Sequence, residues 1–128
     1  MMKFKHTLIA ALVLIGTAAQ AQLSTPQPSP TATISQKVGL TDVSVTYSRP
    51  GMKDRTVFGD VVPFDKLWRT GANKATAITF STDVQFGGKD VKAGTYSLFT
   101  IPGKTDWTII LNSNTELWGT GGYEEAKD

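Results

Sequence analysis

The side chains with the clearest capacity for chemistry are Arg49, Arg55 and Arg69, the only three arginines in the 128-residue sequence. They all fall within residues 49–73, RPGMKDRTVFGDVVPFDKLWRTGAN, a stretch without strand periodicity. Arginine presents a rigid planar fork that pairs bidentately with carboxylates and phosphates and stacks on aromatic rings. Loops this long in compact domains are usually functional, or else the segment has been wrongly assigned as a loop. This loop is therefore predicted to bind an anionic or carbonyl-rich ligand, a small polar molecule or a glycan.

Local sequence features suggest how the arginines could converge. Arg49 precedes Pro50, which biases it toward an extended conformation. Arg69 lies just before Gly71, which permits close backbone approach and unusual φ angles. One surface depression is expected, and its candidate ligand-binding residues are Arg69, Arg49 and Asn73, which converge on it, Trp68 at its floor and Arg55 at its rim.

A structural role for the same arginines is the main alternative. They could pin the loop by bonding backbone carbonyls and the nearby acids Asp54, Asp60 and Asp65. The protein would then be a structural or interaction domain of the cell envelope rather than a binding module. The two hypotheses differ in whether the guanidinium groups are unpaired around a pocket or saturated by partners.

The sequence excludes several kinds of catalysis. It contains no cysteine, and its only histidine is His6, within a predicted leader. A Ser-His-Asp or Cys-His nucleophile and a His-ligated zinc are therefore not expected. The acidic residues lack calcium-loop spacing. We predict no metal, no cofactor and no catalytic residue, and a His-free hydrolase that uses two carboxylates stays a remote alternative.

The N-terminus, residues 1–21, has the pattern of a cleaved secretory signal. Lys3 and Lys5 precede an apolar run over residues 8–15, and Ala19-Gln20-Ala21 forms a small-x-small exit. The run is too short to span a bilayer, so no mature membrane anchor is expected. We predict an exported protein, periplasmic or secreted after cleavage near Ala21.

The remaining chain is electrically balanced. Without Lys3 and Lys5, 11 of the 13 Lys and Arg residues remain, against 11 Asp and Glu. Binding to nucleic acid or to an anionic membrane is disfavoured because it requires clustered excess positive charge. The partner is predicted to be a small polar ligand or an envelope component. Residues 22–30 are rich in proline and are predicted to be a tether, and residues 31–128 a single β domain.

Strand patterns dominate the predicted domain. Residues 41–48 alternate apolar and polar side chains, and residues 31–38 are expected to pair with them as a hairpin. Short strands with turn signals recur from residue 75 to 111, including Gly87-Gly88. We predict an all-β antiparallel sandwich or barrel-like sheet of about seven short strands, with at most one short helix, at residues 63–68. The predicted core comprises Val43, Val45, Tyr47, Ile78, Phe80, Leu98, Phe99, Trp107, Ile109 and Leu111.

Longer sequence strings carry a family resemblance. These are YSRPGMKDRTVFGDVVPFDKLWRTGANKAT, GGKDVKAGTYSLFTIPGKTDWTIILN and LWGTGGYEE. They resemble the bacterial exported family catalogued as domain of unknown function 2911. The resemblance implies a mostly β domain and brings no established activity, cofactor or catalytic residue. Family members generally continue past GYEE, whereas this sequence stops at Asp128, so the domain is expected to lack its C-terminal strands and to leave an open sheet edge.

Overall fold

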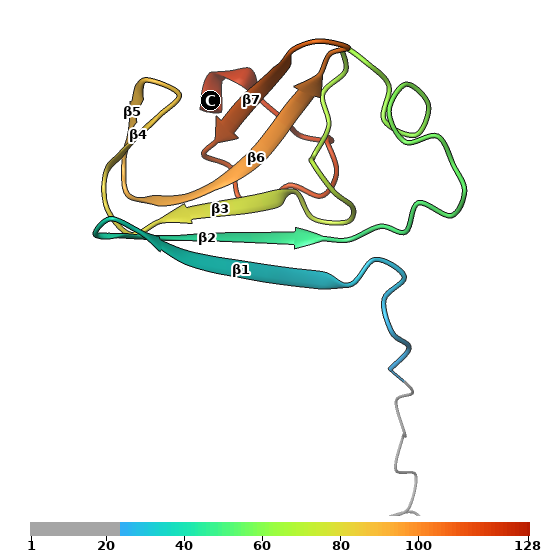
Figure 1. Ribbon diagram of the computed structural model, residues 1–128, viewed down its shortest axis with the longest axis horizontal. Helices are drawn as coiled ribbons and strands as arrows, with labels where there is room; N and C mark the ends of the chain where they lie inside the picture. Colours follow the sequence, from blue (N-terminus) through green and yellow to red (C-terminus); the bar gives the residue numbers. More distant parts are fainter. Residues whose placement is uncertain (1–23) are drawn as a thin grey trace, which may run out of the picture.

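The computed structural model describes residues 24–128, and the predicted signal at residues 1–21 lies outside the described part. Strands make up nearly all of the regular structure (Figure 1). Within residues 24–128 the only helical element is one short 3-10 turn. The elements are β1 (Thr31–Val38), β2 (Thr41–Ser48), β3 (Thr76–Phe80), β4 (Val84–Phe86), β5 (Lys89–Val91), β6 (Gly94–Pro102), β7 (Trp107–Asn112) and η1 (Glu125–Lys127).

Five strands form one antiparallel sheet in the order β1-β2-β3-β6-β7, and β4 and β5 form a separate two-stranded ribbon. In the central pairs, Val45 lies opposite Ile78 and Ile78 lies opposite Tyr96. Within residues 24–128 the strands do not close into a barrel. The predicted fold class, all-β and antiparallel with about seven short strands in a sandwich-like arrangement, is confirmed.

The predicted hairpins form where the sequence places turn residues. β1 and β2 pair along their whole lengths, from Thr31 opposite Ser48 to Val38 opposite Thr41. Gly87 and Gly88 join β4 to β5 with φ angles of 57° and 80°, in the region that glycine enters without steric cost.

The prediction of at most one short helix is confirmed, but the candidate segment, residues 63–68, is not helical. Asp65 has a φ of 58°, which interrupts any right-handed helical turn. The Asp65 amide donates to the carbonyl of Pro102 at 2.8 Å, and the Trp68 amide donates to the carbonyl of Thr100 at 2.8 Å. The segment thus takes its backbone hydrogen bonds from β6, and these replace the bonds that a helix would have made.

Buried side chains occur on both faces of the five-stranded sheet. Phe99, fully buried on β6, packs with Ala75 and Leu117 in a core that also includes Leu67, Ile110 and Tyr123 at its margin. Ile78 and Phe80 are buried on β3. These positions agree with the predicted core, whereas the predicted Val43, Val45, Tyr47, Leu98 and Leu111 are half-buried.

Two predicted core residues are instead exposed. Trp107 retains 46% of its accessible surface and Ile109 retains 54%. Both lie on β7, which is an edge strand of the sheet. Alternation along β7 correctly indicates that Trp107 and Ile109 share a face. That face, however, is only partly covered at this edge, so neither side chain is enclosed.

The C-terminal segment forms a defined element against the end of β7, although its charged residues predict none. The Ser113 amide donates to the carbonyl of Lys127 at 2.8 Å. The fully buried Asn112 amide group donates to the Glu124 carbonyl at 2.9 Å and to Asp128 Oδ1 at 2.6 Å. These bonds satisfy the polar group of Asn112, which would otherwise destabilise the fold.

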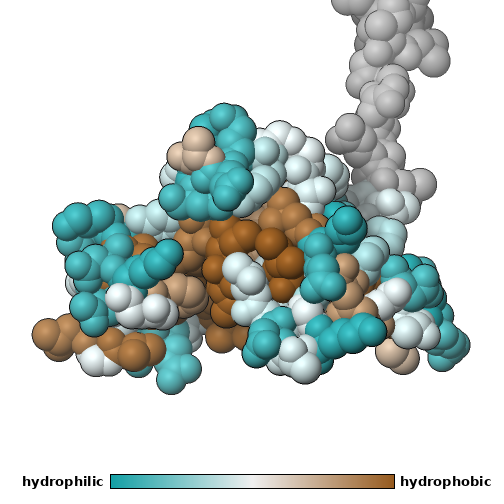
Figure 2. Space-filling view, turned by 90° about the horizontal axis from the view of Figure 1, so that it is seen from above, coloured by the Kyte–Doolittle hydropathy of each residue, from teal (hydrophilic) through white to brown (hydrophobic). Residues whose placement is uncertain are grey.

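Apolar side chains gather in the middle of one face of the molecule, with hydrophilic residues on either side (Figure 2). Large apolar side chains that stay partly exposed include Phe58, Val61 and Ile109. Among residues 24–128 no helix is long and apolar enough to cross a membrane.

Phe99→Ala should destabilise the domain by about 3–5 kcal/mol, because it leaves a cavity at a fully buried position. Trp107→Ala should cost less, since almost half of that side chain is already exposed. Urea unfolding followed by circular dichroism measures both changes. Equal losses for the two variants would contradict the burial described above.

Candidate functional site

The arginine loop, residues 49–73, connects β2 to β3 and lies at one end of the sheet, with the β4–β5 ribbon at the other end (Figure 1). Its return half is fixed to β6. The amides of Trp68 and Thr100 each donate to the other residue's carbonyl, at 2.8 and 2.9 Å. These reciprocal bonds form an isolated antiparallel bridge. The position of Arg69, the next residue along the chain, is therefore set by the sheet.

Gly71 brings the two ends of the loop together. A Cβ atom added at Gly71 would lie 3.1 Å from the Ser48 carbonyl oxygen and 3.3 Å from Thr76 Oγ1. Only a residue without a side chain fits this approach without displacing a neighbour. Since Ser48 is the last residue of β2, the contact places Arg69 close to Arg49, the residue that follows β2.

Thr70, between Arg69 and Gly71, has a φ of 57°, which is unusual for a β-branched residue. Its Oγ1 lies 3.0 Å from Thr100 Oγ1, and its carbonyl accepts a hydrogen bond from Thr76 Oγ1 at 2.7 Å. Such backbone strain costs on the order of 1–3 kcal/mol and persists only where surrounding contacts enforce it. The hydrogen bonds of Thr70 provide that enforcement.

A pocket of about 570 Å³ lies between the end of β2 and the loop. Four of the five site residues predicted from the sequence line this pocket. They are Arg49, Arg55, Trp68 and Arg69. The polar lining comes from Ser29, Tyr47, Ser48, Arg49, Arg55, Arg69 and Thr70, and the rest of the lining from Pro50, Gly51, Met52, Val57, Val61, Val62, Trp68, Gly71 and Ala72.

The pocket contains all three arginines and no acidic residue. Among residues 24–128, every ion pair involves a lysine, and no arginine is paired with a carboxylate. Asp54, Asp60 and Asp65, the acids proposed as partners in the structural alternative, thus form no ion pair with an arginine. The lining thus carries three positive charges and no negative one, although residues 24–128 as a whole have 11 positive and 11 negative groups.

Arg55 fixes the loop through backbone carbonyls. Its Nε donates to the Met52 carbonyl at 2.9 Å, and its Nη2 donates to the Gly51 carbonyl at 2.8 Å. The side chain closes the turn at Lys53 and Asp54, whose φ angles are 51° and 58°. Arg55 therefore has the local role that the structural alternative expects, while it also lines the pocket.

Arg69 differs from Arg55 in its surroundings. Its Nε is buried and makes no hydrogen bond within the described residues. Its Nη1 lies 3.7 Å from the position that a Cβ of Gly119 would occupy, so the far end of the guanidinium reaches the C-terminal segment. Leaving a buried donor without a partner costs about 1–3 kcal/mol, and more for a charged group.

Asn73 does not line the pocket. Its Nδ2 donates to Gln27 Oε1 and to the Ser29 carbonyl, both at 3.3 Å. The Arg49 amide donates to the Pro30 carbonyl at 2.9 Å, so the segment before β1 is held against both ends of the loop. The structure therefore leaves Asn73 out of the pocket lining and gives it a contact with residues 24–30, among which Ser29 does line the pocket.

Trp68 belongs to an aromatic cluster behind the pocket. Its ring meets Phe58 at a centroid distance of 6.1 Å and Trp107 at 6.4 Å, and Phe58 meets Trp107 at 5.2 Å, all edge to face. The cluster fixes the orientation of Trp68.

The sequence analysis identified Trp68 as a site residue but did not identify the valines that line the pocket. The string VFGDVV at residues 57–62 is the sequence signal that could have indicated them.

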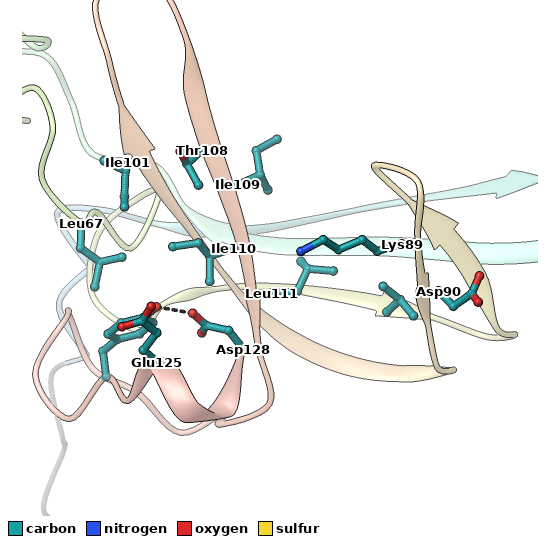
Figure 3. A pocket seen from close by; sticks show the side chains of 12 residues that line it. Leu67, Lys89, Asp90, Ile101, Thr108, Ile109, Ile110, Leu111, Glu125 and Asp128 are labelled. Carbon is teal, nitrogen blue, oxygen red and sulfur yellow. Dashed lines mark hydrogen bonds between the residues drawn. The ribbon is translucent and has the colours of Figure 1, made fainter.

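A second depression, of about 670 Å³, follows the edge strand β7 (Figure 3). Side chains from the β4–β5 ribbon, including Lys89, and from the C-terminal segment, including Glu125 and Asp128, line it together with Ile110 and Leu111. Tyr123 donates to an Asp128 carboxylate oxygen. Burial, followed by this hydrogen bond, raises the pKa of Tyr123 to about 12. Its charged lining combines Lys89 with Asp90, Glu125 and Asp128, so this depression lacks the uniform positive charge of the arginine pocket and is the weaker candidate for binding an anion.

Within the described residues, no group of three or more His, Cys, Asp or Glu could hold a metal ion. The fold and the pocket together define an antiparallel β domain with an arginine-lined cavity at one end of its sheet. Residues 29–128 match the family described as "Protein of unknown function (DUF2911)". The chain belongs to this family. No curated protein and no solved structure matches the chain.

Gly71→Ala should destabilise the domain by about 1–3 kcal/mol, because its Cβ would press against Ser48 and Thr76. Gly121→Ala is the matched control, since a Cβ there meets nothing within 4 Å. The control should change stability by no more than about 0.5 kcal/mol. Thermal unfolding of both variants checks the difference, and a Gly71 variant as stable as the control would refute the close approach.

Proposed function

We propose that this protein is a non-catalytic binding module whose arginine-lined pocket takes a small polar or glycan-like ligand with an anionic or carbonyl-rich group. Arg69 and Arg49 are the proposed primary contacts, Trp68 forms part of the wall, and Arg55 supports the rim. Asn73 is proposed to act indirectly, by holding the loop against residues 24–30.

A single observation carries this proposal. All three arginines line one cavity that contains no acid, and none of them is ion-paired within residues 24–128. Like charges gathered without counter-charges are unfavourable for folding, and a ligand anion would relieve that repulsion. Stabilising a surface loop does not require unpaired arginines. Each of the four ion pairs within residues 24–128 joins a lysine to a nearby acid.

A structural or interaction domain of the cell envelope is the second candidate, and Arg55 is the observation that favours it. Both of its hydrogen bonds go to carbonyls of its own loop. If Arg49 and Arg69 act in the same way, the pocket would be a by-product of loop closure. Substitution at Arg69 separates the two functions.

Titration calorimetry of the full chain with D-glucuronate and with D-glucose tests the binding function. The two sugars share a ring and differ at the carboxylate, so glucuronate should bind about tenfold more tightly or better. Arg69→Lys keeps the charge but loses the fork, so it should weaken glucuronate binding about tenfold while the fold stays intact.

Lys89→Gln is the matched control, because it removes a cation that lines the second depression rather than this pocket. It should leave glucuronate binding unchanged. Equal binding of both sugars, or equal losses in the Arg69 and Lys89 variants, would overturn the proposal. Loss of stability in Arg69→Lys with no sugar binding in the parent protein would favour the structural role.

We propose further that the protein works outside the cytoplasm, in the periplasm or secreted. The support is the charged, apolar and small-residue pattern of residues 1–21. Mass spectrometry of the protein recovered from cell fractions checks this. The exported form should begin at Gln22, and an intact N-terminus found only in the cytoplasm would refute it.

A further inference from the structure

We infer that the ligand of the arginine pocket is a monocarboxylate with an apolar body, rather than a polyphosphate or a neutral glycan. This inference rests on the proposed binding function and specifies its ligand class. Three features of the pocket support it: the guanidinium donors without partners, the small number of free hydroxyl groups, and the apolar side chains in the rest of the lining.

The number of available guanidinium groups limits the charge of the ligand. Arg55 already uses Nε and Nη2 on the carbonyls of Met52 and Gly51. Arg49 and Arg69 have no such bonds within residues 24–128, and the buried Arg69 Nε is left without any acceptor. Arg69 is half-buried and Arg49 is exposed. Their two guanidinium groups match one carboxylate, which accepts several hydrogen bonds through two oxygens. A polyphosphate would bring more charge than this pair neutralises.

Four hydroxyl side chains line the pocket, and only those of Ser29 and Tyr47 make no hydrogen bond within residues 24–128, so a neutral sugar would find two free hydroxyl partners. Ser48 Oγ lies 3.4 Å from Thr31 Oγ1, and Thr70 Oγ1 lies 3.0 Å from Thr100 Oγ1. The Ser29 carbonyl accepts from Asn73. A sugar buried here would leave several of its hydroxyls unpaired, and each unpaired group would reduce affinity.

Apolar groups supply much of the remaining wall. The lining includes Val57, Val61 and Val62 together with Pro50 and Met52. Burial of a hydrocarbon against such a surface contributes about 0.8 kcal/mol for each methylene removed from water. A carboxylic acid with a short apolar chain could thus make both kinds of contact. Its carboxylate would bind the guanidinium groups, and its chain would pack against the valines.

Titration calorimetry of the full chain with acetate, hexanoate, 1-hexanol and inorganic phosphate tests the inference. Hexanoate should bind at least about tenfold more tightly than acetate, because the pocket buries part of its chain. It should also bind about tenfold more tightly than 1-hexanol, which lacks the carboxylate, and more tightly than phosphate.

Val61→Thr provides a near-isosteric change in the wall. Val61 is 44% exposed, so the variant should fold normally while hexanoate affinity falls about threefold and acetate affinity stays the same. Val38→Thr is the matched control, an equally conservative change at a 60% exposed valine on β1 outside the pocket. It should change neither affinity.

The outcomes distinguish failure of this inference from failure of the proposed binding function. If glucuronate binds through Arg69 but hexanoate is no better than acetate, or phosphate binds more tightly than hexanoate, the ligand class is wrong and the binding function stands. If neither glucuronate nor any of these four probes binds, both are wrong. An equal fall in hexanoate affinity for the two valine variants would also overturn the inference.

Discussion

The contact of the Gly71 backbone with the carbonyl of Ser48 is the constraint on which the pocket depends. β2 ends at Ser48 and β3 begins at Thr76, and the chain between these neighbouring strands must travel outward and return. Close approach at Gly71 fixes the point of return. The reciprocal hydrogen bonds of Trp68 and Thr100 then hold the returning chain on β6. A long irregular loop is ordered in this way by a few backbone contacts at its ends.

Energetically unfavourable features occur together in the arginine loop. Thr70 has a left-handed backbone conformation, and the Arg69 Nε is buried without a partner, a condition that within residues 24–128 it shares only with Ser97 Oγ on β6. Departures of this kind from local rules collect at functional sites in natural proteins, where stability elsewhere in the fold offsets them. The same domain forms its lysine ion pairs and its turns in the ordinary way. The contrast supports a role for the loop beyond connecting two strands.

Much of the fold could be predicted because local signals agree with the global structure. Alternation along residues 41–48 and the glycines at 87 and 88 correctly predict strands and a hairpin. The facing of Trp107 could not be predicted, since alternation assigns side chains to a common face without saying whether anything covers it. The helix expected at residues 63–68 fails because Asp65 and Trp68 bond to a strand that is distant in sequence. For the site, the occurrence of all three arginines in one loop identified them. The absence of Asn73 from the pocket lining could not be predicted, because it depends on contacts with residues before β1.

The charge balance of the domain has a kinetic consequence. Residues 24–128 contain equal numbers of positive and negative groups, while the arginines gather at one end of the sheet. At physiological ionic strength such a local field decays within about 8 Å of the surface. An anion approaching from farther away would experience little attraction, so its arrival would depend on diffusion rather than on electrostatic steering. Selectivity among anions would therefore depend mainly on the dissociation rate. That rate would be set more by contacts with the pocket lining than by the ionic strength of the solution.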